Sequence, residues 1–555
     1  MIRYIFIYSA FLFFVNALAA ADLIKFKDES ATAGIDHQYK GSWEYFVGGG
    51  LATFDCNQDR KPDLFIAGGK STAKLFINHS STAGTLSFQQ AKLDLSERDL
   101  KKVTGAYPLD IDGDGLLDLV LLRVGSNILL KGQENCQFKK MNKAWQFEGG
   151  RSWSTAFSAM FEGENTFPTM AFGHYVNRSA PGSPWGTCHD NQFFRPVSSI
   201  GTDQKKNRKK QTPDYSHEIL LSPGYCALSM LFTDWNKSGE PDLRISNDRH
   251  YYRGGEEQLW HIRPGILPRI YTRNEGWRRV TIWGMGIAEG DLDGDGFPEY
   301  ALTSMGDTKL YTLDEDAEEE WPIYRDIAFE RGVTAHRPYS GEDFRPSTGW
   351  HAEFADFNND SRLDLFISKG NVEDMKDFAA FDPDNLLLNQ FDGKFVEAGD
   401  HAGLDTNKRG RGASVADFNA DGLLDLIVVN REAKPTVFRN LGAITPWGVR
   451  PAGNWLQLEI SQFGKNRHAV GAVLAIKTGN LTQIRKIQVG GGHASGRSGF
   501  IHVGLGVAER AEIRIKWPDN SWSAPYRVFA NQFALIERDE TLVRYWYPEP
   551  VNNTP

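Results

Sequence analysis

The sequence has few cysteines and few long apolar runs for its size. Four of its 555 residues are cysteine. After residue 20, no stretch reaches the roughly 18 consecutive apolar residues that a membrane-spanning helix needs. No cysteine directly follows residue 20 to carry a lipid anchor. We therefore expect a chain without a membrane span.

Familiar catalytic and zinc-binding spacings are also missing. His174, His250 and His351 each stand near the end of an expected strand, and no Ser/His/Asp, Cys/His or zinc-ligand arrangement surrounds them. We expect these histidines to be hydrogen-bonded structural residues. The sequence thus gives no catalytic residue and no cofactor other than a metal ion, and whether the protein is an enzyme stays open, with a non-enzymatic role favoured.

One basic run stands out in an otherwise acidic chain of net charge −9. It contains Lys205, Lys206, Arg208, Lys209 and Lys210. Such a run could bind acidic glycans or nucleic acid, but in an acidic exported protein a solvated loop is the favoured interpretation. Nucleic acid is therefore not an expected partner.

Residues 1–19 have the features of a secretory signal peptide. Arg3 precedes an apolar stretch that runs through Val15, and Ala17 and Ala19 form a small-residue cleavage site. An uncleaved signal anchor is the alternative. We expect a secreted protein, either extracellular or periplasmic.

The four cysteines are even in number in a chain bound for an oxidising compartment, which favours two disulfides. Three pairings are possible. We favour Cys56 with Cys136, which would tie neighbouring repeats, and Cys188 with Cys226, which bracket one irregular segment. Four free, buried cysteines are the alternative.

Residues 109–122 crowd four carboxylates against an apolar run, in the sequence LDIDGDGLLDLVLL. Two carboxylates about 4 Å apart repel by roughly 4 kcal/mol at an effective dielectric constant near 20, so a cation should lie among them. Oxygens at loop positions 1, 3, 5 and 9, with glycine at position 6, can surround a hard cation such as Ca²⁺. An EF-hand loop would need Glu at position 12, where this loop has Leu121.

The same spacing of oxygen-bearing residues occurs in six loops, which predicts up to six Ca²⁺ sites. Their candidate ligands are Asp55, Asn57, Asp59 and Asp63; Asp110, Asp112, Asp114 and Asp118; Asp234, Asn236, Ser238 and Asp242; Asp291, Asp293, Asp295 and Glu299; Asp356, Asn358, Asp360 and Asp364; and Asp417, Asn419, Asp421 and Asp425. Position 12 is apolar in every loop, which excludes EF-hand and dockerin-like sites together. The alternative is that the loops are solvated turns without a metal.

The residues around these loops repeat as well, which predicts an all-β, seven-bladed β-propeller. Small and apolar residues precede each loop and a short apolar strand follows it. Residues 153–173 keep this pattern, but Met160 and Pro168 stand where ligands should be, so we expect a seventh repeat without metal. About four short strands per repeat are typical of propeller blades. Segment 26–35 has no loop before it, and we expect it to complete the last blade.

These loops resemble the FG-GAP (VCBS) repeats of integrin α-subunit propellers, and the resemblance covers about residues 22–445. It implies a seven-bladed ring with Ca²⁺ bound on one face. Arg60 and Ser361 replace the loop glycine, and Ser238 replaces a carboxylate, so the loop at 234 is the weakest predicted site. Residues 174–226 are expected to form an insertion.

Residues 450–540 alternate apolar and polar positions, as half-buried antiparallel strands do, and predict a small β-domain. This stretch resembles the ASPIC/UnbV domain through GKNRHAVGA (464–472), HVGLG (502–506) and KWPDN (516–520). A C-terminal tail at 541–555 follows. A propeller followed by this domain resembles the domain layout of the cartilage acidic protein family. The resemblance implies an extracellular or periplasmic calcium-binding protein, but it implies no particular ligand or reaction.

Three functions fit these features. The favoured one is a non-enzymatic binding or adhesion module for an extracellular or envelope protein or a glycan. The aromatic segment at 246–260 could line its recognition surface, although aromatic residues of blades more often pack between sheets. The alternatives are a polysaccharide hydrolase or lyase with a site in the propeller funnel, for which the fold alone is weak support, and a scaffold for cell-envelope assembly.

Overall fold

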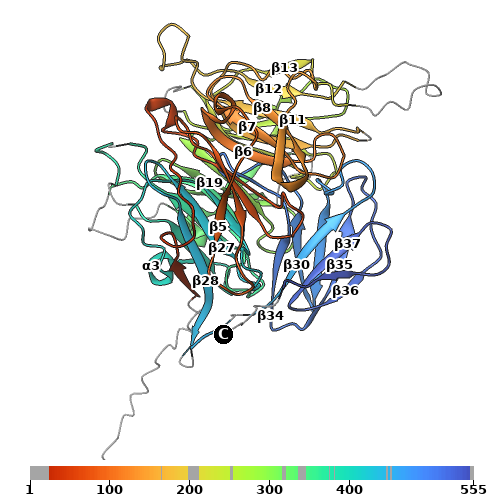
Figure 1. Cartoon of the computed structure of the whole chain (residues 1–555). Coiled ribbons are helices and arrows are strands. Elements are labelled where there is room, and N and C mark those ends of the chain that lie inside the picture. Colours follow the sequence, from red (N-terminus) through yellow and green to blue (C-terminus); the bar gives the residue numbers. More distant parts are fainter. Residues whose placement is uncertain are drawn as a thin grey trace, which may run out of the picture.

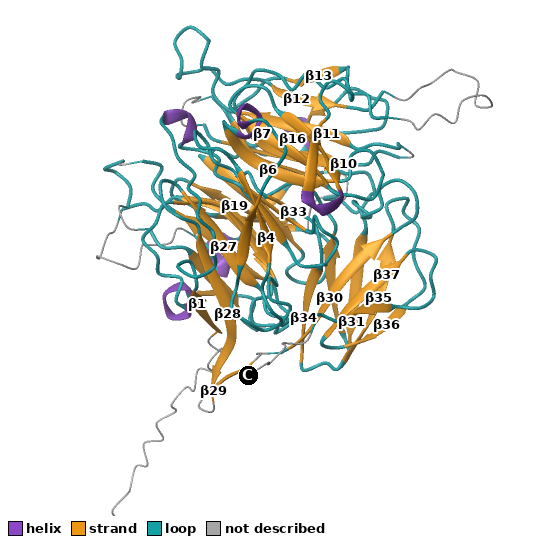
Figure 2. Cartoon of the chain, in the orientation of Figure 1, coloured by secondary structure: helices purple, strands orange, loops and turns teal. Residues whose placement is uncertain are grey.

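The structure is a computed structural model that describes residues 24–163, 165–197, 212–249, 254–314, 321–334, 345–373, 375–379, 382–445, 448–450 and 453–549. The predicted signal peptide, His250 and the basic run at 205–210 lie outside these residues. Strands make up nearly all of the regular structure (Figures 1 and 2). The prediction of an all-β fold is confirmed.

Within the described residues, six sheets each contain four consecutive strands that pair in chain order. They are β2 (Leu51–Phe54), β3 (Asp63–Ile66), β4 (Lys74–Asn78) and β5 (Phe88–Ala91); β6 (Val103–Leu109), β7 (Asp118–Arg123), β8 (Ile128–Gln133) and β9 (Gln137–Lys140); β10 (Ser154–Met160), β11 (Thr169–His174), β12 (Asn191–Phe194) and β13 (Glu218–Leu221); β14 (Ala227–Thr233), β15 (Asp242–Asn247), β16 (Gln258–His261) and β17 (Arg269–Ile270); β18 (Gly284–Gly290), β19 (Glu299–Ser304), β20 (Lys309–Leu313) and β21 (Tyr324–Asp326); and β22 (Gly349–Ala355), β23 (Asp364–Lys369), β24 (Asn385–Asn389) and β25 (Phe395–Glu397).

A seventh sheet joins the two ends of this region. It contains β26 (Gly410–Ala416), β27 (Asp425–Asn430), β28 (Thr436–Thr445) and β1 (Ile24–Asp28), with β29 (Gly448–Arg450) paired to β28. β1 pairs antiparallel with β28, placing Phe26 opposite Asn440. The prediction that the N-terminal segment completes the last blade is confirmed.

The first strand of each sheet contacts the first strand of the next, and β26 contacts β2, so the series closes into a ring. Every residue of the second strands, such as β3 and β7, is buried, because neighbouring sheets cover both of their faces. This arrangement has the order that a seven-bladed propeller requires. The blade count itself stays a prediction.

The helices are single turns at the edges of the sheets: α1 (Glu97–Leu100), α2 (Ala328–Arg331), α3 (Gly399–Ala402), η1 (Trp43–Tyr45), η2 (Glu134–Cys136) and η3 (Arg273–Glu275). α2 and α3 end at Gly332 and Gly403, whose left-handed conformation is typical of a helix C-terminus. Among the described residues, no helix has the length and apolar composition needed to cross a bilayer.

The segment at 174–226 differs from the prediction, because it is part of the ring and not only an insertion. β12 and β13, the two outer strands of the third sheet, lie within it. Phe193, Phe194 and Leu221 are buried there, so the segment supplies apolar side chains that the sheet needs. The preferred disulfide pairing is confirmed for both bonds, Cys56–Cys136 and Cys188–Cys226.

The C-terminal domain consists of two four-stranded sheets around their own apolar core. One contains β34 (Ile501–Gly506), β30 (Asn454–Ser461), β37 (Gln532–Glu537) and β38 (Arg544–Trp546), and the other β32 (Leu481–Lys486), β31 (Val473–Thr478), β35 (Arg510–Lys516) and β36 (Tyr526–Phe529). β38 corrects the prediction of a tail from residue 541. Trp546 packs on Phe500 and Phe533, which draws this part of the chain into the domain.

A glycine-rich segment of the C-terminal domain, residues 488–497, runs through the inner side of the ring. Bridges join Val489 to Ala159, Gly490 to Leu231 and Gly492 to Ile287. β33 (Gly496–Arg497) then pairs parallel with β2. The segment therefore contacts first strands from several sheets and fixes the C-terminal domain to the ring.

Candidate functional site

Each of the six predicted metal loops connects the first and second strands of a sheet, and each lies against the C-terminal domain. Direct interactions join Arg60 to Glu459 at 3.1 Å, His502 to Asn359 at 2.6 Å and Gln457 to Asp417 at 3.3 Å. In the other three loops, a Cβ built on Gly113, Gly239 or Gly294 would lie within 4 Å of Lys465, Asn520 or Thr482. The loops therefore share one face of the ring, which the C-terminal domain covers.

The loops share one backbone geometry. In all six, the Oδ2 atom of the first acidic residue accepts a hydrogen bond from the backbone N–H at position 6, over 2.8 to 3.0 Å. Position 6 has a positive φ in every loop, including Arg60 (66°) and Ser361 (77°), where the usual glycine is replaced. Non-glycine residues adopt this conformation at a steric cost. The two departures from the motif thus keep its loop conformation.

The loop at 110 brings its acidic groups together most clearly. One oxygen each from Asp110, Asp112 and Asp118 lies within 4.8 Å of the others. Asp112 Oδ1 is buried and has no hydrogen-bond partner among the described residues. The ammonium group of Lys131 contacts the other oxygen of Asp112 and an oxygen of Asp114. Lys131 therefore pairs with one oxygen of Asp112 and leaves the buried Oδ1 without a partner among the described residues.

The loop at 291 gathers oxygens of Asp291, Asp293 and Asp295 within the same 4.8 Å limit. Thr312 donates from its hydroxyl to Glu299, the acid at position 9. Burial, together with repulsion by Asp293 and Asp291, raises the pKa of Glu299 to about 8. A cation bound among these carboxylates would favour their charged forms.

Asparagine replaces aspartate at position 3 in the loops at 55, 356 and 417, where its amide donates to the acid at position 5. The distances are 3.1 Å from Asn57 to Asp59, 2.9 Å from Asn358 to Asp360 and 3.0 Å from Asn419 to Asp421. The amide thus removes one repulsion that the loops at 110 and 291 retain. Asn419 Oδ1 is buried and unpartnered among the described residues.

The loop at 234 does not fit a metal site. Asp242, at position 9, accepts from Ile262 N and Arg263 Nη1 on one oxygen and from Trp235 Nε1 and Tyr271 OH on the other. These four donors fill its acceptor capacity, and Arg263 supplies the compensating positive charge. The loop that the sequence marked as weakest is therefore stabilised by protein groups.

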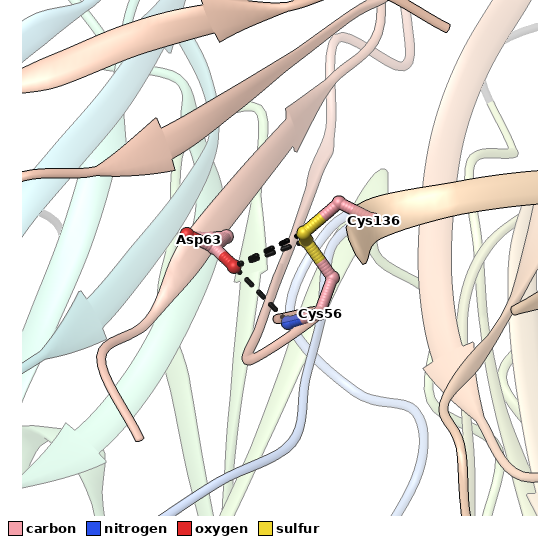
Figure 3. A group of neighbouring side chains, drawn as sticks. All are labelled: Cys56, Asp63 and Cys136. Carbon is pink, nitrogen blue, oxygen red and sulfur yellow. Dashed lines mark hydrogen bonds between the residues drawn. A yellow bond between two sulfur atoms is a disulfide. The ribbon is translucent and has the colours of Figure 1, made fainter. Parts of the chain in front are cut away.

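Figure 3 shows a further group, in which Asp63 lies beside the Cys56–Cys136 disulfide. Asp63 Oδ2 is 3.0 Å from the sulfur of Cys56, and it accepts a hydrogen bond from the backbone N–H of Cys56 at 3.0 Å. A disulfide sulfur carries no proton, so the N–H is the donor. Burial raises the pKa of Asp63 to about 7. The disulfide thus fixes the second residue of the loop at 55 beside the acid at position 9.

The histidines have structural surroundings in the described residues. His174 is fully buried, with Ser154 Oγ at 3.0 Å and Gln192 Oε1 at 2.9 Å, and burial lowers its pKa to about 3. His351 accepts from the backbone N–H of His493 in the glycine-rich segment. His250 lies outside the described residues. Trp260, from the aromatic segment, is buried between sheets.

Sequence reasoning missed two side chains that contact loop acids, Lys131 and Gln457, and the glycine-rich segment that fixes the C-terminal domain to the ring. Lys131 is one strand away from the acids it contacts, and Gln457 and the glycine-rich segment come from another domain. Only the run Gly490–Gly492 carried a signal, because three consecutive glycines are unusual in a domain of alternating strands. All three have positive φ, and a Cβ on Gly492 would lie 2.3 Å from a ring atom of His351.

Comparisons with known proteins agree with the motifs. A model of the FG-GAP-like repeat matches residues 55–121, and a model named ASPIC and UnbV matches residues 462–542. The chain is therefore an all-β protein that carries an FG-GAP-like repeat and an ASPIC/UnbV domain. The resemblance that the sequence motifs indicated is confirmed.

Cartilage acidic protein 1 is similar in sequence to part of this chain. The human protein is 30% identical over 172 residues, which cover 30% of this chain and 24% of the relative. The mouse protein is 29% identical over 172 residues, which cover 30% and 25%. The match thus spans about a quarter of the length of these relatives.

Solved structures show a distant likeness. BBS1N in complex with ARL6DN has a TM-score of 0.40 at 10% identity, over 74% of this chain and 95% of that chain. Sqt1 of Saccharomyces cerevisiae has a TM-score of 0.36 at 12% identity, over 71% and 96%.

Proposed function

We propose that the chain is a secreted or periplasmic calcium-binding β-propeller that acts as a non-enzymatic binding or adhesion module. The observation that carries this proposal is the inward convergence of acidic oxygens in the loop at 110. Asp112 Oδ1 is buried there without a hydrogen-bond partner among the described residues, and one oxygen of Asp112 lies within 4.8 Å of oxygens of Asp110 and Asp118. A buried carboxylate oxygen without a partner is costly, and a cation would satisfy it.

The ligand chemistry favours calcium. Five loops, all except the one at 234, offer carboxylate and amide oxygens and no nitrogen or sulfur ligand at positions 1, 3, 5 and 9. Such oxygen sets suit Ca²⁺, which accepts irregular coordination by six to eight oxygens. Each of these five loops would hold an ion through its first acid, which is Asp55, Asp110, Asp291, Asp356 or Asp417, together with the other ligands of the loop. When bound, the ion would offset repulsion among carboxylates and hold the loop in one conformation.

The two disulfides and the similarity to Cartilage acidic protein 1 support export from the cytosol. We propose an extracellular or envelope protein or glycan as the partner. Because the C-terminal domain covers the loop face, the loops serve as internal supports and the partner surface lies elsewhere on the protein.

The enzyme alternative places its site in the propeller funnel, where the residues that the structure describes give no observation that favours catalysis. A cavity of about 850 Å³ lies between the loop face and the C-terminal domain. Two carboxylates on its wall are already paired, Glu289 with Lys486 at 2.6 Å and Glu353 with Arg497 at 3.0 Å. These charges bind the two domains together.

Titration calorimetry of chelator-treated protein with Ca²⁺ tests the metal proposal. We expect saturable binding in the micromolar to millimolar range, reduced by about one equivalent in Asp110→Ala. Asp94→Ala, a change at an exposed acid, should bind as the parent does. Absence of binding heat, together with no metal in the purified protein, would refute the proposal. Screening of protein and glycan arrays with and without calcium addresses the partner.

A further inference from the structure

The six loops differ in how deeply they are buried. At loop position 3, Asn419 of the loop at 417 is 1% exposed and Asn358 of the loop at 356 is 5% exposed. In the loop at 291, by contrast, Asp293 and Asp295 are exposed. Loops of nearly identical sequence therefore differ in their access to solvent.

Apolar side chains of the C-terminal domain close the loop at 417. Trp455 lies directly on Gly422, since a Cβ built on this glycine would be 1.9 Å from the indole ring. Phe533 packs with Trp455 and with Ala420 of the loop, and Phe500 and Trp546 pack around them. These contacts cover one side of the loop, which also contains the unpartnered Asn419 Oδ1.

Polar groups of the same domain reach the acids themselves. Gln457 Nε2 donates to Asp417 Oδ2 over 3.3 Å. In the neighbouring loop, His502 Nε2 lies 2.6 Å from Asn359 Oδ1, and the backbone N–H of Gly506 donates to Asn359 O at 2.8 Å. Gly504 lies so close that a Cβ there would be 1.9 Å from Asp356 Oδ2. No side chain at position 504 would fit while the domain is docked.

We propose that the C-terminal domain seals the loops at 356 and 417, so that the chain holds two kinetic classes of metal ion. This inference rests on the proposed calcium sites. Ions at 356 and 417 leave only when the domain lifts locally, whereas an ion at 291 exchanges directly with solvent. Local opening is slow compared with the motion of exposed loops, so the sealed ions are structural and the open one responds to the surrounding calcium concentration.

Stopped-flow release measures this difference directly. Calcium-loaded full chain is mixed with an excess of a chromophoric chelator, and total calcium is determined separately after acid denaturation. We expect a fast and a slow phase. Asp291→Ala should remove about one equivalent from the fast phase, and Asp417→Ala about one from the slow phase.

Trp455→Ala tests the seal, because it uncovers the loop at 417 without changing an oxygen ligand. We expect the release from this loop to become about tenfold faster or more, since each 1.4 kcal/mol lost from the closed state raises the open population tenfold. Phe529→Ala, at a position that is 68% exposed in the same domain, should leave both phases unchanged. Gln457→Ala, a milder change, should accelerate the slow phase even if Trp455→Ala does not fold.

The possible results separate the two proposals. Release of all calcium in one phase, or an unchanged slow phase in a folded Trp455→Ala or Gln457→Ala variant, would overturn the sealing while leaving calcium binding intact. If acid denaturation liberates no calcium from protein equilibrated with millimolar calcium, the proposed function fails and the sealing with it.

Discussion

Gln457 donates from its side-chain amide to Oδ2 of Asp417 over 3.3 Å, which joins β30 of the C-terminal domain to the first acid of a predicted metal loop. The same Asp417 oxygen accepts from the backbone N–H of Gly422 at 2.8 Å. Gln457 also contacts His502 Nδ1 at 3.1 Å, and His502 in turn contacts Asn359 in the loop at 356. One short network of side chains thus connects two loops through the covering domain, so that changes in either loop act on domain docking.

Chelation should destabilise the protein, because it restores repulsion among the loop carboxylates. At a calcium concentration about 100 times Kd, one site contributes roughly 2.7 kcal/mol to the free energy of unfolding. We expect EDTA to lower Tm, millimolar Ca²⁺ to restore it, and Asp112→Ala to reduce this difference without abolishing it. Scanning fluorimetry in EDTA and in excess calcium measures this difference in Tm. Equal Tm values in EDTA and in excess calcium would contradict the prediction.

Lys131→Met should make the loop at 110 more dependent on calcium. The Lys131 ammonium neutralises Asp112 and Asp114, and its loss leaves their outer oxygens without a positive partner. We expect Tm to fall more in EDTA than in saturating calcium. Lys139→Met, at an exposed position of the neighbouring strand β9, serves as the control. A fall of equal size under both conditions would show that Lys131 acts only through packing.

The two disulfides should differ in their effect on metal binding. Their sequence separations of 80 and 38 residues correspond to about 4.5 and about 4 kcal/mol of stabilisation in the chain-entropy model. Replacing either pair by serine should therefore cost similar stability. Only the Cys56–Cys136 replacement should weaken calcium binding, because this disulfide holds residue 56 where its backbone N–H donates to Asp63, and serine keeps the N–H but not the restraint. Calorimetric titration with calcium compares the two variants. Equal calcium binding in both would show that the Cys56–Cys136 disulfide does not support the loop at 55.

Gly492→Ala should disturb domain docking beyond the cost of its backbone conformation. Gly492 has φ of 52°, and its added Cβ would meet the His351 ring at 2.3 Å. Gly479→Ala is a matched control, with φ of 58° and nothing within 4 Å of the added Cβ. The left-handed conformation costs each variant about 1 to 2 kcal/mol. We expect a larger loss of Tm and faster limited proteolysis in Gly492→Ala alone.

Stability should fall with rising pH through the titration of Glu257. Burial raises the pKa of this side chain from 4.5 to about 8. Between these values the folded state binds more protons than the unfolded state, so the free energy of unfolding decreases by up to about 1.4 kcal/mol per pH unit. Glu257→Gln should flatten this slope. Urea unfolding from pH 5 to pH 8 in saturating calcium measures the slope of the free energy of unfolding against pH. An equal slope in the parent and in Glu257→Gln would show that Glu257 does not cause it.

The ring and its loops could be predicted because their information is local. Each repeat has acids at the spacing of Asp110 and Asp118, with apolar residues before and after them. This pattern marks the same loop in every repeat. β12 and β13 escaped prediction because they are four residues each and lie 23 residues apart, too short and too distant to show a period.

Docking of the C-terminal domain could not be predicted from the sequence. The alternation of apolar and polar residues along a strand identifies buried positions, but it does not identify the partner that covers them. Leu456 and Leu458 pack in the core of the domain, whereas Gln457 between them points to the propeller. In the sequence, Gln457 is an ordinary polar residue of an alternating strand. Its role depends on Asp417, which only the folded chain brings near.

The pairing of β1 with β28 sets an order of assembly for the chain. β1 begins at Ile24 and its partner strand ends at Thr445, so a strand that is made early waits for nearly the last strand of the ring. Until then the sheets at the two ends of the growing arc each leave an apolar face uncovered, and exposed apolar surface favours association with other chains. Final closure therefore waits for nearly the whole chain, and a chain cut short before β28 remains an open arc however well its individual sheets fold.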